Sequence, residues 1–145
     1  MKNGCYRSGG FTMLEVLLVI AILVILVSLI LPDLIGRRET ALVGAAKIQL
    51  KTIEDALEFF KTDIGRYPTT DEGLEALRDK SQLQDDELAK KWLKPYLKKG
   101  ELKDPWGNEY NYVCPGQKNE DGFDLWSNGP DGQEGTDDDI KNWTE

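Results

Sequence analysis

The chain has 145 residues, with 18 basic and 26 acidic side chains, a formal charge of −8, no histidine and two cysteines. That length accommodates one domain of ordinary size but not two with separate cores. The negative charge argues against a nucleic-acid partner, which needs a basic surface to meet the phosphates. Without histidine, Ser-His-Asp and Cys-His catalysis and histidine-ligated zinc are excluded.

The apolar residues are concentrated in residues 11–31 (FTMLEVLLVIAILVILVSLIL), where Glu15 carries the one charge. An α-helix of this length spans roughly 31 Å, which matches the hydrocarbon core of a bilayer. The preceding residues include Lys2 and Arg7 and no acid, which predicts a cytoplasmic N-terminus and translocation of the polar remainder. The sequence therefore predicts a single-pass membrane helix carrying one water-soluble domain.

A pair of small residues, Gly9 and Gly10, precedes the apolar run instead of following it, so cleavage there would keep the helix in the mature chain. An unpaired carboxylate in lipid costs about 2.5–3.5 kcal/mol, so Glu15 is expected to have a partner. Cleavage after Gly10 would supply one, the new α-amino group of Phe11, in the same chain or an adjoining copy. The alternative is a plain signal anchor that tolerates Glu15.

This leader resembles the class III leader of type IV pilins and type II secretion pseudopilins at Gly10, Phe11, Thr12, Leu14 and Glu15. The resemblance implies that a prepilin peptidase cleaves between Gly10 and Phe11 and N-methylates Phe11. It also implies that Glu15 is needed for assembly of a helical filament.

Cleavage would remove Lys2, Arg7 and Cys5, change the formal charge from −8 to −10 and leave Cys114 as the only thiol. No intramolecular disulfide could then form in the mature chain. Since type IV pilins commonly close their C-terminal region with a disulfide, a different constraint is expected here.

Pro32 follows the apolar run and predicts a kink or an unwound turn. Helical periodicity then resumes, until Gly65 and Pro68 are expected to end a helix of about fifty residues. The residues expected on its buried face are Ala46, Leu50, Ile53, Ala56, Leu57, Phe60 and Ile64.

Thr70 is expected to be the N-cap of a short helix in which Leu74 and Leu77 are buried. The charged segment 78–100 is expected to be pinned to the domain by its apolar residues, which are Leu88, Trp92, Leu93, Tyr96 and Leu97.

Turn signals at residues 104–107 and 119–122 flank an alternating run at Tyr110, Tyr112 and Cys114. A second strand is expected at Phe123–Ser127. The two strands should form an antiparallel hairpin, or part of a small sheet, packed against the long helix, which gives an α+β fold.

Three further segments resemble the major (core) pseudopilin of type II secretion systems, the general secretion pathway protein G family. They are Tyr67-Pro-Thr-Thr-x-x-Gly-Leu74, Asp104-Pro-Trp-Gly-Asn108 and Asp124-Leu-x-Ser-x-Gly-x-Asp-Gly132. The resemblance implies a type IV pilin-like fold with a cleaved leader (1–10), a membrane and assembly helix (11–31) and a periplasmic domain (32–145).

The same resemblance implies a structural subunit, not an enzyme, which polymerises with itself into the pseudopilus that drives folded proteins across the outer membrane. The implied partners are other copies of the chain, minor pseudopilins, the prepilin peptidase, the inner-membrane assembly platform and, before assembly, membrane lipid. No nucleic acid is expected. The implied location is the bacterial inner membrane, with the C-terminal domain in the periplasm.

The C-terminal segment 118–145 contains nine acidic residues and two lysines. Oxygen ligands without histidine or cysteine favour calcium, although the spacing does not fit an EF-hand. Chemistry alone leaves a solvated acidic loop as an equal alternative. The resemblance implies a structural calcium ion that would close the loop, with an uncertain register among the consecutive aspartates 137–139. The expected ligands are Asp131, Asp137 or Asp138 through carboxylates, and Asn128 and Ile140 through carbonyl oxygens.

Three other functions remain as alternatives. A type IV or competence-type pilin would share the leader but not the three later motifs. A membrane-anchored periplasmic enzyme would need a carboxylate in an apolar pocket that raises its pKa, which the sequence does not indicate. A plain membrane-tethered binding module would keep the bond between Gly10 and Phe11 intact.

Overall fold

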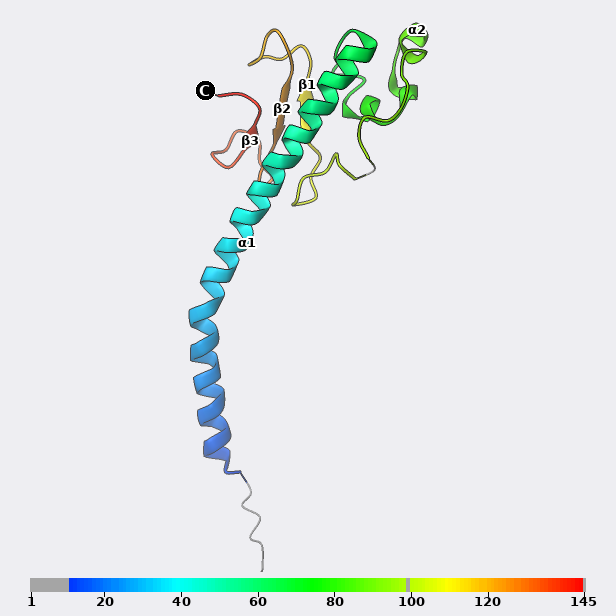
Figure 1. The fold of residues 1–145 in the computed structure, drawn as a ribbon. Coiled ribbons are helices and arrows are strands. Elements are labelled where there is room, and N and C mark those ends of the chain that lie inside the picture. Colours follow the sequence, from blue (N-terminus) through cyan, green and yellow to red (C-terminus); the bar gives the residue numbers. More distant parts are fainter. Residues whose placement is uncertain (1–10, 99, 145) are drawn as a thin grey trace, which may run out of the picture. The chain divides into compact units, whose positions relative to one another are not determined.

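The computed structural model describes residues 11–98 and 100–144, with the side chains of residues 29–35 outside the description. The leader Met1–Gly10 also lies outside it. The chain divides into two compact units, Met1–Arg38 and Glu39–Glu145. In order, the elements are α1 (Met13–Ile64), two 3-10 helices (Leu74–Leu77 and Lys80–Gln82), α2 (Asp86–Ala89), β1 (Asn111–Val113), β2 (Asp124–Ser127) and β3 (Ile140–Lys141) (Figure 1).

Helix α1 is continuous over 52 residues and passes through Pro32 without a break, so the predicted unwound turn is wrong. A proline removes only its own N–H from the helical ladder, and the bonds on either side maintain the helix. The end of α1 is as predicted. Gly65 adopts a φ of 96° and its N–H donates to the Lys61 carbonyl at 2.8 Å, which closes the last turn.

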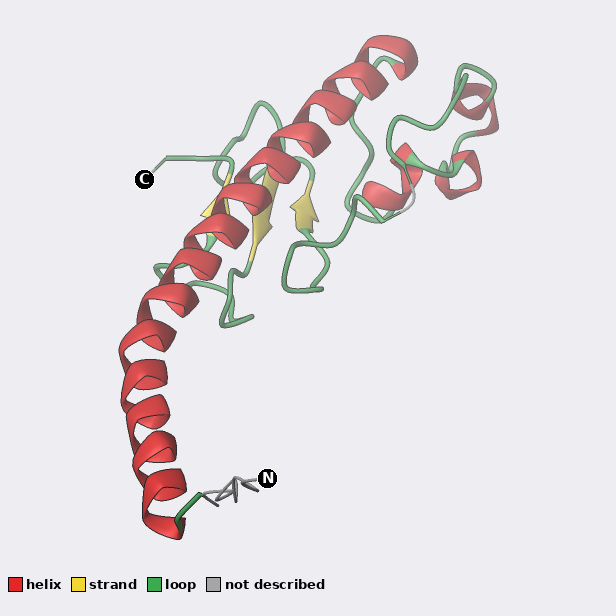
Figure 2. Ribbon diagram, turned by 60° about the horizontal axis from the view of Figure 1, so that its bottom comes forward, coloured by secondary structure: helices red, strands yellow, loops and turns green. Residues whose placement is uncertain are grey.

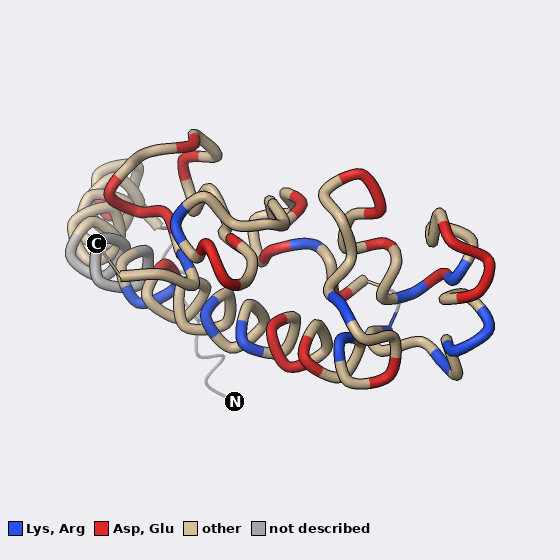
Figure 3. Tube along the Cα trace, turned by 90° about the horizontal axis from the view of Figure 1, so that it is seen from above, with Lys and Arg blue, Asp and Glu red and all other residues tan. Residues whose placement is uncertain are grey.

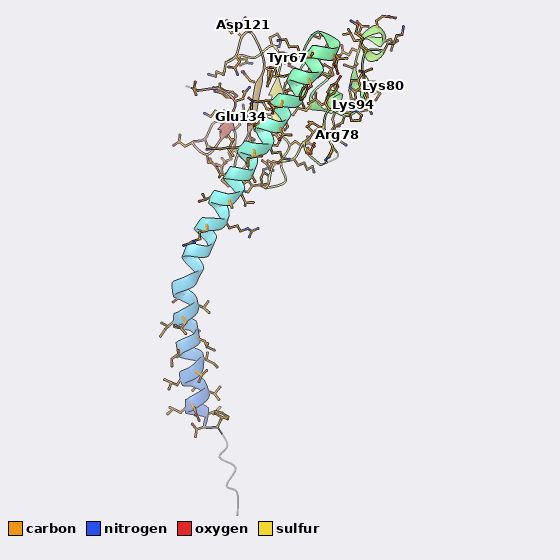
Figure 4. All side chains as sticks on the ribbon, in the orientation of Figure 1. Tyr67, Arg78, Lys80, Lys94, Asp121 and Glu134 are labelled. Atoms are coloured by element: carbon orange, nitrogen blue, oxygen red, sulfur yellow. The ribbon has the colours of Figure 1, made fainter. Side chains whose placement is uncertain are left out.

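The first part of α1 presents apolar side chains on every side. Residues 11–28 are all exposed, and the large apolar side chains among them have exposed fractions from 48% to 88%. Figure 4 shows these side chains projecting all around the helix. Within the described part of the chain, no helix meets the length and hydropathy that crossing a membrane requires.

The second part of α1 buries one face, as its periodicity predicts. All seven residues of the predicted face are buried, and Ile53, Leu57 and Phe60 are completely enclosed. This face lies against an antiparallel sheet of order β1-β2-β3 (Figure 2). The register pairs Tyr112 with Leu125 and Ser127 with Ile140. The predicted α+β arrangement of a long helix on a small antiparallel sheet is therefore confirmed, with β3 as an additional strand.

The connection after α1 differs from the prediction at Thr70. Its hydroxyl donates to the Cys114 carbonyl at 3.1 Å and accepts from the Cys114 N–H at 3.0 Å, so it fastens this connection to the end of β1. The short helix begins later, after Gly73, and has no side-chain cap. Leu74 and Leu77 are buried as predicted.

The segment 78–100 is attached to the domain at several residues, among them Leu83, which is buried in the core. Leu97 is buried, the Trp92 indole donates to the Ala76 carbonyl at 3.1 Å, and the Tyr96 hydroxyl donates to Asp63 at 2.9 Å. Leu93 is 78% exposed, so the prediction that it packs on the domain is wrong. It lies in an irregular stretch where no helical period carries it to the buried side.

Candidate functional site

The first candidate site is the start of α1. Thr12 precedes the helix, and its hydroxyl oxygen accepts from the Glu15 N–H at 3.3 Å. Glu15 is exposed in the first turn, where a carboxylate complements the positive end of the helix dipole. Phe11, four positions earlier in the chain, is 82% exposed. Gly10, the other side of the predicted cleavage point, lies outside the described residues.

The capping role of Thr12 was not predicted, although its signal is in the sequence. A threonine followed three positions later by glutamate is the capping-box pattern, and Thr12 and Glu15 have this spacing. The described contact is the threonine half of that box. This contact places Glu15 in the first turn of α1.

The second candidate site is the acidic loop between β2 and β3. Acidic residues follow one another along the trace near the C-terminal end (Figure 3). The Thr136 hydroxyl joins two predicted ligands, since it lies 2.6 Å from Asp138 Oδ1 and 3.5 Å from Asp131 Oδ1. The Asp131 N–H also donates to Asp138 Oδ2 at 3.3 Å. The hydrogen bond that the Thr136 hydroxyl donates lowers the pKa of the Asp138 carboxyl.

Gly129 allows the loop to close tightly on Asp138. It adopts a φ of 64°, and a Cβ at this position would lie 2.5 Å from the Asp138 carbonyl oxygen and 2.9 Å from its Oδ2. Only glycine accommodates both the backbone conformation and this approach. The loop thus brings Asp138 against the chain next to Asn128.

The remaining predicted ligands are placed differently. Asp137 is exposed, whereas Ile140 is buried in β3 opposite Ser127. The Asn128 side chain accepts from Asn111 at 2.7 Å, which leaves its backbone carbonyl as the group relevant to a cation. The Asp139 carboxylate accepts from the Gly135 N–H at 2.8 Å, and the Asp139 N–H donates to the Thr136 carbonyl at 3.3 Å.

Among the residues that the structure describes, no three acidic, cysteine or histidine side chains are grouped closely enough to hold a metal ion. The loop therefore offers two carboxylates together, those of Asp131 and Asp138. A hard cation here would need backbone carbonyl oxygens and water for the rest of its shell, which calcium accepts and which the flexible geometry of calcium sites permits.

The second and third motifs meet at the end of β2. Asp104 is buried, and its Oδ1 accepts from the N–H groups of Trp106 and Asn108 at 3.1 and 2.8 Å. Its Oδ2 accepts from the buried Ser127 hydroxyl at 2.7 Å. The turn at 104–107 is therefore fixed to the end of β2, where the acidic loop begins.

The first motif, at residues 67–74, is fixed by a buried ion pair that the sequence did not indicate. Arg66 donates to both oxygens of Glu72 at 2.6 and 2.7 Å, and the Glu72 side chain has no exposed surface. Pro68 is fully buried nearby, and its carbonyl accepts from the Tyr112 hydroxyl at 2.8 Å. These contacts connect the end of α1 to β1.

Comparisons with known proteins agree with the motifs. Residues 33–143 match the family model described as type II secretion system protein G, and residues 5–31 match the model for the prokaryotic N-terminal methylation motif. The type II secretion system core protein G of Aeromonas hydrophila is 43% identical over 141 residues, covering 94% of this chain and 93% of that protein. The protein of the same name from Pseudomonas aeruginosa is 44% identical over 141 residues, covering 94% and 96%.

A solved structure is also similar. It is the crystal structure of the major pseudopilin from the type 2 secretion system of enterohaemorrhagic Escherichia coli, with a TM-score of 0.63 and 35% identity. The match covers 79% of this chain and 96% of that one.

Proposed function

Because the chain belongs to the type II secretion system protein G family, we propose that its copies polymerise through α1 into a helical filament. The chain is a structural subunit of the pseudopilus, not an enzyme. The relatives carry the name of the secretion-system core protein, which favours this function over a type IV or competence-type pilin. We further propose that the growing filament drives folded proteins across the outer membrane, in contact with minor pseudopilins and an inner-membrane assembly platform.

The observation that carries polymerisation is the exposure of the first part of α1. Its large apolar side chains are exposed on every side, with fractions from 48% to 88%. A helix that is apolar all round is stabilised either by lipid or by other helices. We propose that lipid surrounds it before assembly and that identical helices replace lipid in the filament, where close packing stabilises their association.

Membrane anchoring is consistent with the prepilin-type N-terminal motif at residues 5–31. We propose that the helix crosses the inner membrane once, with the N-terminus cytoplasmic and the sheet domain periplasmic. Lys2 and Arg7 favour that orientation, since positive residues remain on the cytoplasmic side.

Processing is proposed at the bond between Gly10 and Phe11, by a prepilin peptidase that also N-methylates Phe11. Mass spectrometry of the chain from its host membrane tests this. The expected N-terminal peptide begins with N-methylphenylalanine, whereas a chain that retains Met1 contradicts the proposal. Gly10→Val should leave the leader attached, with Gly9→Val as the control at the neighbouring glycine.

Calcium is proposed as a structural ion of the acidic loop. Asp131 and Asp138 would supply carboxylates, with Asp137 as an alternative donor, and the carbonyls of Asn128 and Ile140 would add neutral oxygens. The donor chemistry fits, because the Thr136 hydroxyl joins the first two carboxylates and Gly129 allows the loop to close on Asp138. The ion would reduce the repulsion among these acids and fasten the loop without a disulfide.

Chelation tests the calcium proposal. Addition of EGTA to the calcium-loaded chain should lower its melting temperature, because an ion that binds only the folded state stabilises it. Asp131→Ala should abolish this response. Asp121→Ala, an exposed acid in the turn at 119–122, is the control and should keep it. A wild-type chain with the same melting temperature in calcium and in EGTA would contradict the proposal.

A further inference from the structure

Strand β1 forms one edge of the sheet, whose order is β1-β2-β3 (Figure 1). Along a strand, the backbone N–H and C=O groups of successive residues point alternately to its two sides. The Leu125 N–H and C=O both bond to Asn142, on the β3 side of β2. Tyr112 lies directly opposite Leu125, so its own N–H and C=O point away from β2, along the free edge of the sheet.

The positions on either side of Tyr112 along this edge are covered by other parts of the chain. The Thr70 hydroxyl bonds to both backbone groups of Cys114, at 3.0 and 3.1 Å. The Tyr110 N–H donates to the Leu102 carbonyl at 3.4 Å. Between them, the Tyr112 N–H and C=O have no partner in the part of the chain that the structure describes. The strand rises about 13 Å from Tyr110 to Cys114, which leaves a gap with room for about three extended residues.

A hollow of about 410 Å³ opens beside this gap. Tyr110, Asn111 and Tyr112 line it, together with Leu102 and the connection at residues 71–75. The volume lies within the usual range of binding sites, about 300–1,000 Å³. The unpaired backbone groups of Tyr112 therefore lie at a space large enough for a short segment of chain.

The hollow is acidic. Among the described residues that line it, none is basic and four carry a carboxylate, which are Asp71, Glu72, Glu75 and Glu109. Glu72 is paired with Arg66, whereas the other three are exposed. Arg78 lies 3.2 Å from Glu75 and offsets one of these three charges. The charge that remains is negative, so a basic ligand is favoured.

A peptide segment matches these features better than a small cation. Tyr112 presents one donor and one acceptor, which an adjoining strand would satisfy, and strand addition at a free sheet edge is a common mode of peptide recognition. A polyamine or a metal ion would offset the charge but could not accept a hydrogen bond from the Tyr112 N–H. We propose that the hollow binds an extended, basic segment of a partner protein. The segment bonds to both backbone groups of Tyr112, and its lysine or arginine side chains contact Asp71, Glu75 and Glu109.

The same carboxylates oppose pairing of two copies of this chain edge to edge. Unpaired sheet edges promote aggregation, and charged side chains at an edge are a common protection against it. Pairing of two β1 edges would bring the acids of both copies together, and like charges repel. The partner therefore presents a surface different from this one. The proposal depends neither on polymerisation through α1 nor on calcium, and its test can fail while those proposals hold.

The test uses the full-length chain in phosphocholine micelles and follows the Tyr112 amide signal in a ¹⁵N–¹H correlation spectrum. The probe is a pentapeptide with blocked ends, lysine at its second and fourth positions and valine between them. It should shift the Tyr112 signal in a saturable manner and slow the exchange of this amide with solvent, because the N–H becomes bonded. The same peptide with glutamate in place of lysine should not bind. N-methylation of the three central amides should weaken binding about tenfold, because the peptide then has no donor for the Tyr112 carbonyl.

Paired substitutions test the charges of the hollow. Asp71→Asn combined with Glu109→Gln should weaken binding about fivefold, because two exposed ion pairs are lost. Glu120→Gln combined with Asp121→Asn is the control, since it removes two exposed acids outside the hollow and should leave binding unchanged. The proposal is overturned if the peptide moves signals of the acidic loop but not that of Tyr112. It is also overturned if the N-methylated peptide binds with unchanged affinity, or if the two paired variants have equal effects.

Discussion

The Glu72 carboxylate is enclosed and accepts four hydrogen bonds. Two come from Arg66, one from the Thr69 N–H at 2.9 Å and one from the Gln84 N–H at 3.1 Å. The Arg66 guanidinium is the main reason that the pKa of Glu72 falls to about 2. Because this pKa lies below its unfolded value of about 4.5, the stabilisation is complete above that value and is lost as the pH falls toward 2.

Glu72→Gln should therefore lower the free energy of unfolding at pH 7 by about 3 kcal/mol, because Arg66 loses its charged partner. It should also flatten the loss of stability between about pH 4.5 and 2. Urea unfolding followed by tryptophan fluorescence measures both effects, since all four tryptophans lie in the sheet domain. Glu75→Gln, from an exposed pair with Arg78, is the control and should change stability by less than about 1 kcal/mol. Equal effects of the two substitutions would contradict this account.

At the scale of elements, the buried face of α1 holds the helix on the sheet. Ile53 is fully buried on this face, whereas Ile48 on the same helix is 72% exposed. Ile53→Ala should lower the free energy of unfolding by about 2–4 kcal/mol, and Ile48→Ala should change it by less than about 0.5 kcal/mol. Urea unfolding of the unassembled chain distinguishes them, and similar losses at both positions would show that this face does not carry the packing.

Sequence reasoning predicted correctly the residues whose positions depend on the helical repeat or on a backbone conformation that one residue type prefers. The seven buried positions of α1 follow the helical repeat, and Gly65 ends the helix because it adopts a positive φ. The features that sequence reasoning did not predict depend on partners far along the chain. Thr70 bonds to Cys114, and β3 is a strand of two residues that exists only through pairing with β2.

In the candidate sites too, local sequence predicts some features and the folded chain determines the others. The spacing of Thr12 and Glu15 contains the cap of α1, and the composition of the acidic loop identifies its carboxylates. The pairing of Asp131 with Asp138 through Thr136 depends on how the loop closes, which composition does not specify.

At the scale of the whole molecule, the proposed assembly replaces the lipid around the first part of α1 with neighbouring helices. In lipid, an unpaired Glu15 costs about 2.5–3.5 kcal/mol, and pairing with the α-amino group of an adjoining Phe11 would remove that cost. On this proposal, Glu15 would bias each subunit toward the filament. Glutamine has no charge to relieve, so Glu15→Gln should shift the equilibrium toward unassembled subunits by about 100-fold, which corresponds to about 2.7 kcal/mol.

The measurement is the fraction of chemically cross-linked, sedimentable filaments in membranes of cells that express each variant. Mass spectrometry must first show that Glu15→Gln is cleaved and N-methylated, so that a loss of filaments reports assembly and not processing. Asp55→Asn, an exposed acid on the second part of α1, serves as the control and should assemble as the wild type does. Glu15→Asp should assemble to an intermediate extent, because it keeps the charge on a shorter side chain. Wild-type filament yield from processed Glu15→Gln would show that helix packing alone drives assembly and that the carboxylate has no part in it.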